Sequence, residues 1–315
     1  MPASSIVDVL RKSENSIILP HVQADGDALC SSLALAMALK RLNNNAILYL
    51  EEEIPRVYSF LPGRDLIKVY SNEVVSPGTV IAVDTGDLER LGKRISMFRD
   101  ARITVNIDHH PTNTYFAGIN YVLPGSSAVG EIIYGLIGMM GVKLDKDIST
   151  CLYVAIATDT GGFRYANTTS RTHEIVADLV NAGVNISEIS SKIFDSISLG
   201  KLKLMGAAIN SLELLDGGRI AFITITEKTI RVAGASEDEC EGIVNLGKNL
   251  QGVEIAVLFR EKNGEVKVSL RSNSDADVSI IAGKYGGGGH KNAAGCVVKG
   301  ELEYVKRRIE ADLKA

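Results

Sequence analysis

Short apolar runs that end on acidic or histidine residues recur through the first half of the chain. The runs span residues 17–19, 80–83, 103–107 and 152–158. The first three are short and bounded by polar residues, which is typical of buried strands. The fourth fits a strand or a buried helix equally well, because periodicity alone does not separate the two.

The segments between these runs have the pattern of helices. Residues 28–42 are rich in Leu, Ala and Met, with Lys40 and Arg41 in the last turn, and residues 127–140 and 172–181 are similar. Strands that alternate with helices predict an α/β fold with a mostly parallel, doubly wound sheet. Ligands bind such sheets beyond the carboxyl ends of the strands, so the acidic and histidine residues predict one shared site.

The character of the chain changes in the second half. Strands are predicted at residues 219–226, 253–260 and 265–271, and helices at residues 237–248 and 302–313. The Asn-Gly pair between the last two strands predicts a hairpin turn. These elements indicate a second, smaller α/β domain.

Length and composition agree with two globular domains. The 315 residues favour two domains, and we expect them at residues 1–185 and 201–315, joined by a helical linker at 186–200. The hydrophobic fraction of 45% excludes disordered and collagen-like chains. A net charge of −4 disfavours a protein that coats duplex nucleic acid, although it leaves room for a metal site or a small basic pocket.

The compartment is predicted from the cysteines and from the apolar stretches. The four cysteines, at positions 30, 151, 240 and 296, show no zinc-finger spacing and are expected to be reduced, buried thiols. The N-terminus lacks the features of a signal peptide, and the apolar stretches are too short to span a bilayer. We therefore expect a soluble, cytoplasmic protein without a membrane partner.

The strand-end motifs together predict a metal centre. Their aspartates and histidines are His21, Asp25, Asp27, Asp84, Asp108, His109, His110 and Asp159. Asp-Gly-Asp alone is common turn chemistry, and here an extended loop is expected to aim Asp25 and Asp27 the same way. Two adjacent histidines after a strand-end aspartate, however, have no common structural purpose. Clustered carboxylates do not all stay ionised without cations, so divalent ions are expected.

The ligand types narrow the choice of ion and of reaction. Carboxylate and imidazole ligands without thiolate favour Mn²⁺ or Mg²⁺, with Zn²⁺, Fe²⁺ or Co²⁺ allowed by geometry. There are enough ligands for two ions, and paired ions are suited to the attack of water on phosphorus. The hypothesis from the residues is a two-metal hydrolase.

The motifs HVQADGD, AVDTGD, NIDHHPTN and ATDTGG, followed by GGGGHKNAAG, resemble those of the DHH-family phosphoesterases with a DHH-associated C-terminal domain. The resemblance covers nearly the whole chain and is strongest to the NrnA-type enzymes, which degrade nanoRNA and dephosphorylate 3′-phosphoadenosine 5′-phosphate (pAp). It implies one ion held by His21 and Asp25, a second held by Asp27, His109 and Asp159, and Asp84 shared by both. It also implies that Asp108 orients ligands and that His110 contacts the reacting phosphate or assists the leaving oxygen.

The glycine run at residues 286–289 is not a dinucleotide-binding fingerprint, because the required spacing and acidic partner are missing. Backbone N–H groups at a helix start, beside Lys284 and Lys291, are expected to form an anion cradle. By the resemblance, the residues that grip a substrate phosphate are Gly287, Gly288, Gly289, His290 and Arg271, with Arg260 as a weaker candidate. A phosphate held at a fixed distance from the ions, across a cleft between domains, predicts a preference for short oligonucleotides.

The resemblance implies hydrolysis of short single-stranded RNA, linear dinucleotides included, and of pAp, with two ions that are most often Mn²⁺. Two alternatives stay open: a cyclic-dinucleotide phosphodiesterase and a non-catalytic nucleic-acid binding module. A family-II pyrophosphatase is disfavoured by the glycine-rich loop, and a long-chain RecJ-type exonuclease by the absence of room for a further domain. A homodimer is expected from the likeness alone.

Overall fold

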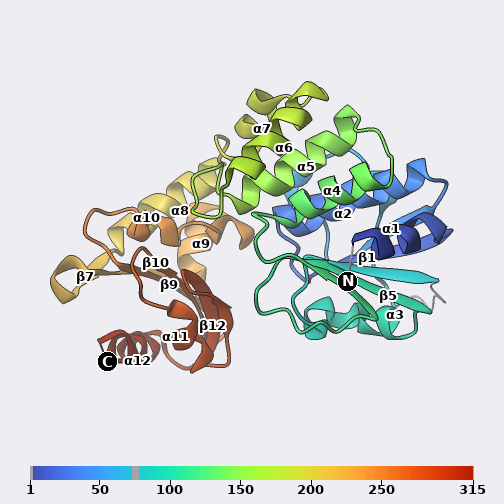
Figure 1. Cartoon of the computed structure of the whole chain (residues 1–315). Coiled ribbons are helices and arrows are strands. Elements are labelled where there is room, and N and C mark those ends of the chain that lie inside the picture. The colour runs from blue at the N-terminus through green and yellow to red at the C-terminus, as the bar shows by residue number, and fades with distance from the viewer. Residues whose placement is uncertain (1–2, 73–77, 315) are drawn as a thin grey trace. The chain divides into compact units, whose positions relative to one another are not determined.

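The computed structural model describes residues 3–72 and 78–314, and the chain divides into two units, Met1–Asp195 and Ser196–Ala315 (Figure 1). Each unit has its own sheet and its own hydrophobic core. The division lies inside the segment 186–200, where the sequence predicts a linker. Among the described helices, none combines the length and the apolar character that crossing a membrane would require.

The sheet of the first unit has six parallel strands in the order β3-β2-β1-β4-β5-β6. The strands are β1 (Asn15–Pro20), β2 (Asn45–Leu50), β3 (Ile67–Val69), β4 (Thr79–Val83), β5 (Ile103–Asp108) and β6 (Ile119–Val122). The order reverses between β1 and β4, which confirms the predicted doubly wound fold. The register sets Pro20 level with Val83, and Val83 level with Ile107. The residues that follow β1, β4 and β5 therefore share one edge of the sheet.

Helices cover both faces of this sheet because the strand side chains alternate between two apolar clusters. Ile18 and Ile81 pack with the helices of one face, and Ile17 and Val80 pack with η3 and α3 on the other. The helices are α1 (Ala3–Lys12), α2 (Gly26–Arg41), η1 (Arg56–Tyr58), η2 (Arg64–Leu66), η3 (Leu88–Arg94), α3 (Ile95–Arg99), α4 (Val129–Met139), α5 (Lys146–Asp159), α6 (Ser170–Asn181) and α7 (Ile186–Ile193).

The ambiguous apolar run 152–158 is part of α5, so it is a buried helix and not a strand. α5 packs along α2, and the first residue of α2, Gly26, lies against Thr158 in the last turn of α5. A Cβ on Gly26 would lie 2.4–2.7 Å from side-chain atoms of Thr158. The glycine between the two aspartates is therefore needed for this close approach, and it brings Asp159 beside the start of α2.

The second unit has a mixed sheet in the order β11-β12-β10-β9-β8-β7. Its strands are β7 (Glu213–Leu215), β8 (Ile220–Ile225), β9 (Ile255–Lys262), β10 (Glu265–Ser272), β11 (Gly288–His290) and β12 (Ala293–Lys299). β8 and β9 are parallel, and the other neighbours are antiparallel. Asn263 and Gly264 both have positive φ, at 51° and 76°, as a type I′ turn requires. The predicted hairpin between β9 and β10 is confirmed.

Helices pack on both faces of the second sheet. They are α8 (Leu199–Asn210), η4 (Asp216–Gly218), α9 (Glu227–Ala233), η5 (Asp238–Cys240), α10 (Val244–Lys248), α11 (Val278–Gly283) and α12 (Leu302–Lys314). The prediction of one helix over 237–248 is wrong. Gly242 has a φ of +80°, which interrupts the helix between η5 and α10.

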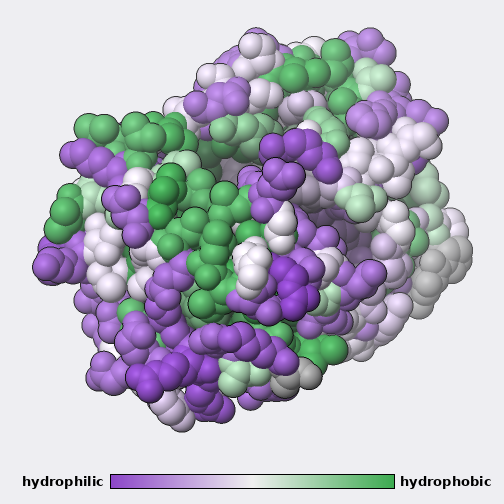
Figure 2. Space-filling model, turned by 90° about the vertical axis from the view of Figure 1, so that its left-hand side faces the viewer, coloured by the Kyte–Doolittle hydropathy of each residue, from purple (hydrophilic) through white to green (hydrophobic). Residues whose placement is uncertain are grey.

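Some apolar side chains of the second unit stay exposed, among them Leu199, Leu202 and Ile209 on α8. Residues three and seven positions apart lie on the same side of a helix, so α8 presents an apolar stripe. Figure 2, which views the molecule from the left-hand side of Figure 1, shows hydrophobic patches between hydrophilic ones.

Candidate metal centre

The first group of candidate ligands lies where β1 and β4 end. His21 Nε2 is 3.8 Å from Asp25 Oδ2 and 3.9 Å from Asp84 Oδ2. His21 Nδ1 donates to the Val22 carbonyl at 2.8 Å, which turns Nε2 toward the two carboxylates. One ligand atom from each of these three residues lies within 4.8 Å of the others.

Asp25 and Asp27 reach the centre from the start of α2, whereas both were expected on an extended loop. Only Asp25, the residue before the helix, has extended backbone. Asp25 is the N-cap of α2 and accepts a hydrogen bond from the Ala28 N–H at 3.0 Å. Asp27 lies in the first helical turn and is fully enclosed. The physical reason is that the capping Asp25 begins the helix at Gly26, two residues earlier than the apolar pattern indicates.

The second group is formed by Asp27, His109 and Asp159, which also have ligand atoms within 4.8 Å of one another. His109 Nε2 lies 3.8 Å from Asp159 Oδ2, and its Nδ1 donates to the Ser126 carbonyl at 3.1 Å. Burial would lower the pKa of His109, but the nearby Asp27 and Asp159 carboxylates raise it overall. Asp159 comes from the last turn of α5.

Asp84 lies between the two groups. Its Oδ2 is 3.9 Å from His21 Nε2, and its Oδ1 is 3.6 Å from His109 Nε2. Its φ of +55° turns the chain sharply after β4. Oδ1 is buried and accepts no hydrogen bond within the described residues, and a buried carboxylate oxygen without a partner is costly unless a cation compensates it.

Two metal ions fit this donor set. Metal–oxygen and metal–nitrogen bonds are about 2.0–2.2 Å long, so two ligands of one ion lie at most about 4.4 Å apart. The nitrogen–oxygen distances of 3.6–3.9 Å in the two groups are within that limit. The two oxygens of Asp84 face different groups, Oδ2 toward His21 and Oδ1 toward His109, which is the arrangement that a shared ligand requires.

The electrostatics of the carboxylates also favour cations. Burial raises the pKa of Asp84 well above its ordinary value, and the charges of Asp27 and Asp25 add to the shift. Burial raises the pKa of Asp159 to about 7, and the charge of Asp27 contributes next. Carboxylates this close together are not all ionised at neutral pH unless positive charge is supplied.

Asp108 is fully buried and holds His110. Asp108 Oδ1 is 2.7 Å from His110 Nδ1, and Asp108 Oδ2 accepts from Asn113 Nδ2 at 2.6 Å. Burial alone would raise the pKa of Asp108, but the hydrogen bonds with His110 and Asn113 lower it overall. Asn113 also donates to Asn106 Oδ1 and accepts from the Tyr115 N–H. Sequence reasoning assigned Asn113 no role, although it lies inside the NIDHHPTN motif.

Sequence reasoning also missed the support around Asp27. Asp27 accepts hydrogen bonds from the Val129 N–H at 2.6 Å, the Gly130 N–H at 3.0 Å and the Ser31 hydroxyl at 2.7 Å. The two N–H groups belong to the first turn of α4, where the helix dipole favours a negative charge. The sequence signals the start of α4 through Ser126 and Ser127. It does not show that the N–H groups of this helix end bind Asp27.

In the second unit, the glycine run at residues 286–289 does not have the backbone structure expected of an anion cradle at a helix start. Gly288–His290 forms the edge strand β11, and α11 ends before it, so the expectation of a helix start here is wrong. A Cβ on Gly287 would lie 2.2 Å from the Gly295 carbonyl oxygen, so only glycine fits beside β12. β11 is exposed, and both His290 and Arg271 are in register with Ala293.

The two candidate arginines do not lie together. Arg271 is in register with Ala256, whereas Arg260 is in register with Lys267, four residues along β10. Four residues of a strand span about 13 Å. Arg260 Nη1 also donates to the Glu237 carbonyl at 3.0 Å, which ties β9 to η5. The two arginines therefore do not form one phosphate-binding cluster on the hairpin.

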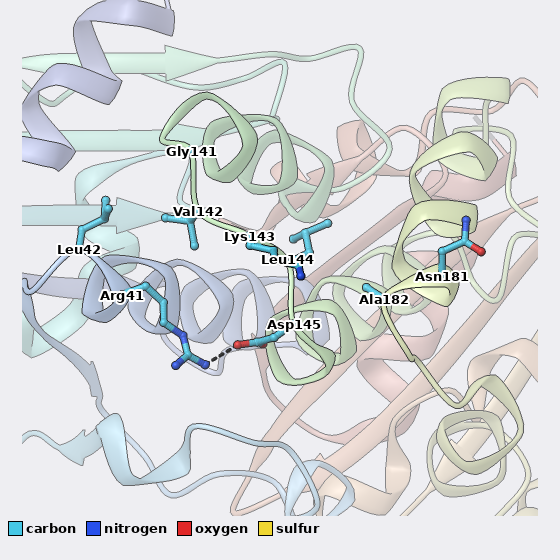
Figure 3. A pocket seen from close by; sticks show the side chains of 9 residues that line it. All are labelled: Arg41, Leu42, Gly141, Val142, Lys143, Leu144, Asp145, Asn181 and Ala182. Carbon is cyan, nitrogen blue, oxygen red and sulfur yellow. Dashed lines mark hydrogen bonds and ion pairs between the residues drawn. The ribbon is translucent and has the colours of Figure 1, made fainter.

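A pocket of the first unit lies away from these residues (Figure 3). It is lined by Arg41, Leu42, Gly141, Val142, Lys143, Leu144, Asp145, Asn181 and Ala182, and Arg41 pairs with Asp145. Arg41 ends α2 and Asp145 precedes α5, whereas the candidate ligands lie at the start of α2 and the end of α5. The 16 residues of α2 make a helix about 24 Å long, so the pocket and the metal centre are separate.

Comparison with known proteins gives matches over both units. Residues 15–156 match the DHH family, N-terminal domain, and residues 220–315 match the DHHA1 domain. A bifunctional oligoribonuclease and PAP phosphatase NrnA of Thermus thermophilus is 35% identical over 311 residues, covering 96% of this chain and 91% of that protein. The protein of that name from Bacillus subtilis is 27% identical, covering 99% and 97%.

A solved structure is similar over the same range. The crystal structure of an exopolyphosphatase-related protein from Bacteroides fragilis has a TM-score of 0.94 and 25% identity, covering 99% of this chain and 95% of that one.

Proposed function

This chain belongs to the DHH family and carries a DHHA1 domain, and on that premise we propose that it hydrolyses short oligoribonucleotides, linear dinucleotides included, and dephosphorylates pAp. The relatives that bear both activities in their names support this substrate class. The observation that carries the proposal is the buried carboxylate of Asp84, which lies between two histidine–aspartate groups and has an oxygen that accepts no hydrogen bond from the described residues.

The chemistry is assigned to the first unit. His21 and Asp25 would hold one divalent ion, Asp27, His109 and Asp159 a second, and Asp84 both. Bound ions of this kind acidify a water molecule and neutralise the charge that develops on the phosphate oxygens. The oxygen and imidazole donors suit Mn²⁺, with Mg²⁺, Co²⁺ or Fe²⁺ as substitutes.

The other residues of the centre have supporting roles in the proposal. Asp108 orients His110, which contacts the reacting phosphate or gives a proton to the leaving oxygen. No protein nucleophile is needed. Burial raises the pKa of the Cys30 thiol well above its ordinary value, so the one cysteine beside the Asp-Gly-Asp turn stays protonated and unreactive.

Substrate recognition is assigned to the second unit. The exposed edge strand with Gly287, Gly288, Gly289 and His290, and the neighbouring Arg271, would bind a phosphate of the substrate. Arg260 is left out of this set because Glu237 holds it at the other end of β10. The buried, free thiols of all four cysteines support a reducing compartment such as the cytoplasm, and a homodimer remains a prediction from the family likeness.

The test is product release by the Mn²⁺-loaded protein from labelled RNAs of graded length and from pAp, with Asp84→Ala in parallel. We expect turnover of RNAs of two to about five nucleotides that fades with length, turnover of pAp, and neither reaction in the variant. Turnover of cyclic dinucleotides alone would overturn the substrate assignment. RNA binding without hydrolysis would overturn the enzymatic one.

A further inference from the structure

The segment η3 lies beside the loop that carries His21. The Val22 N–H donates to the Arg90 carbonyl at 2.8 Å, and the Arg90 N–H donates to Asp87 Oδ1 at 3.0 Å. The backbone of Arg90 is therefore fixed on both sides, directly next to the residue that follows His21.

A second set of contacts fixes the end of the same segment. Arg94 is 0% exposed, donates to two backbone carbonyls, and has its Nε 4.0 Å from Glu51 Oε2. Glu51 Oε2 also accepts from the Lys93 N–H at 2.7 Å. Gly92 has a φ of +59°, and a Cβ there would lie 2.3 Å from Glu51 Oε2. A buried arginine is costly unless it keeps its hydrogen bonds and its ion pair, so the contacts of Arg94 hold η3 in one defined position.

The side chain of Arg90 is exposed, and its backbone lies beside Val22, the residue after His21. Burial would raise the pKa of Asp25, but His21, the Ala28 N–H and the charge of Arg90 together lower it. Arg90 is thus close enough to act on Asp25, yet its guanidinium makes no hydrogen bond or ion pair with any residue in 3–72 or 78–314.

We propose that Arg90 binds a non-bridging oxygen of the substrate phosphate on the His21–Asp25 side of the centre. A phosphate ester brings negative charge to a site whose fixed groups are mostly carboxylates. Arg90 supplies a permanent cation there, with a planar donor pair that matches phosphate oxygens. The inference rests on the proposed phosphoesterase function and adds a substrate contact to it.

The experiment compares Arg90→Gln and Arg90→Lys with Lys93→Gln, which removes an exposed cation from the same segment. Calorimetry measures the binding of inorganic phosphate and, separately, of Mn²⁺, and steady-state assays give kcat and KM for a dinucleotide. For Arg90→Gln we expect phosphate to bind at least about tenfold more weakly and kcat/KM to fall in parallel. Arg90→Lys should recover part of the loss, and Lys93→Gln should match the wild type.

Mn²⁺ affinity separates this role from a structural one. Removing a cation beside the site should leave Mn²⁺ binding unchanged or slightly tighter. Unchanged phosphate affinity in Arg90→Gln, an equal loss in Lys93→Gln, or a loss of Mn²⁺ in Arg90→Gln would overturn the proposal. If the wild type binds phosphate but hydrolyses neither RNA nor pAp, the proposed function fails, while the phosphate measurements still decide the role of Arg90. Absence of phosphate binding by the wild type counts against both.

Discussion

Asp25 and Asp27 stand two residues apart at the start of one helix, yet their surroundings are opposite. The Asp25 side chain is 54% exposed, and its pKa is lowered to about 2 with His21 and Arg90 nearby. Asp27 is 1% exposed, accepts three hydrogen bonds, and has a pKa that burial raises. We call His21 with Asp25 the open half of the centre, and Asp27 with His109 and Asp159 the closed half.

The two aspartates of the Asp-Gly-Asp motif therefore differ in role: Asp27 belongs to a half whose geometry the fold fixes, and Asp25 to a half that is open to solvent. The closed half is held by the first turn of α4 and by backbone carbonyls, so its geometry is set by the fold. The open half has a solvent-facing carboxylate, and the charge of the exposed Arg90 acts on it, which suits the entry of a charged substrate. Substitutions in the two halves should therefore have different consequences.

The largest effect is expected where the halves meet. Asp84→Ala removes the carboxylate that lies between the two groups, so kcat for a dinucleotide should fall by at least about 10³-fold, and the number of bound Mn²⁺ ions per chain should drop. Elemental analysis after dialysis and a turnover assay measure the two quantities. Activity within tenfold of the wild type would show that the two groups work independently.

The next effect separates the halves directly. Asp27→Asn places an amide opposite backbone N–H donors, so it should weaken Mn²⁺ binding and also destabilise the protein by about 1–3 kcal/mol. Asp25→Asn should weaken Mn²⁺ binding with stability changed by no more than about 0.5 kcal/mol, because Asn caps helices as well as Asp. Metal titration and chemical denaturation of the metal-free proteins test the pair. Equal losses of stability in both variants would contradict the division.

A smaller effect is expected from the support of Asp108. Asn113→Ala removes the donor to Asp108 Oδ2, so kcat should fall by about 10- to 100-fold, with little change in KM. Asn120→Ala is the matched control, since among the described residues its amide bonds to the backbone of the loop before β6 and not to Asp108. A loss that appears in KM and not in kcat, or is equal in the control, would argue against this role.

The sequence predicted the positions at the strand ends well because they depend on register. Apolar runs place β1, β4 and β5 in one parallel sheet, and parallel strands of similar length end at the same edge. His21 and Asp84 therefore lie together, as expected. Asp159 also joins them, but from a helix, because a buried apolar run has the same pattern in either structure.

Other parts could not be predicted, for reasons of packing. The burial of Arg94 and the hydrogen bonds of Asn113 depend on which loop lies over which strand end, and local sequence does not encode this. The glycine-rich loop was expected at a helix start, but its backbone pairs with β12, and Gly287 is needed because it lies against Gly295 and Cys296 of that strand. Contacts of this kind leave no periodic signal in the sequence.

The smallest effect concerns the closed half without its ions. The pKa of Asp159 is raised from 3.8 to about 7 in the folded chain. A carboxylate with a raised folded-state pKa contributes stability that is full below pH 4 and is lost as the pH rises through about 7. The metal-free protein should therefore be less stable at pH 8 than at pH 5.5, by an amount on the order of 1 kcal/mol once solvent screening is allowed for.

Asp159→Asn tests this slope, because the amide has no proton to lose. Asp27 and Asp84 shift in the same direction, so the variant should keep only part of the pH dependence measured by denaturation in a chelator. Added Mn²⁺ should reverse the slope in the wild type, since cations compete with protons for the same carboxylates. If variant and wild type show the same pH dependence of the free energy of unfolding, Asp159 is already ionised in the metal-free protein. The charges of the closed half would then raise its pKa less than its burial implies.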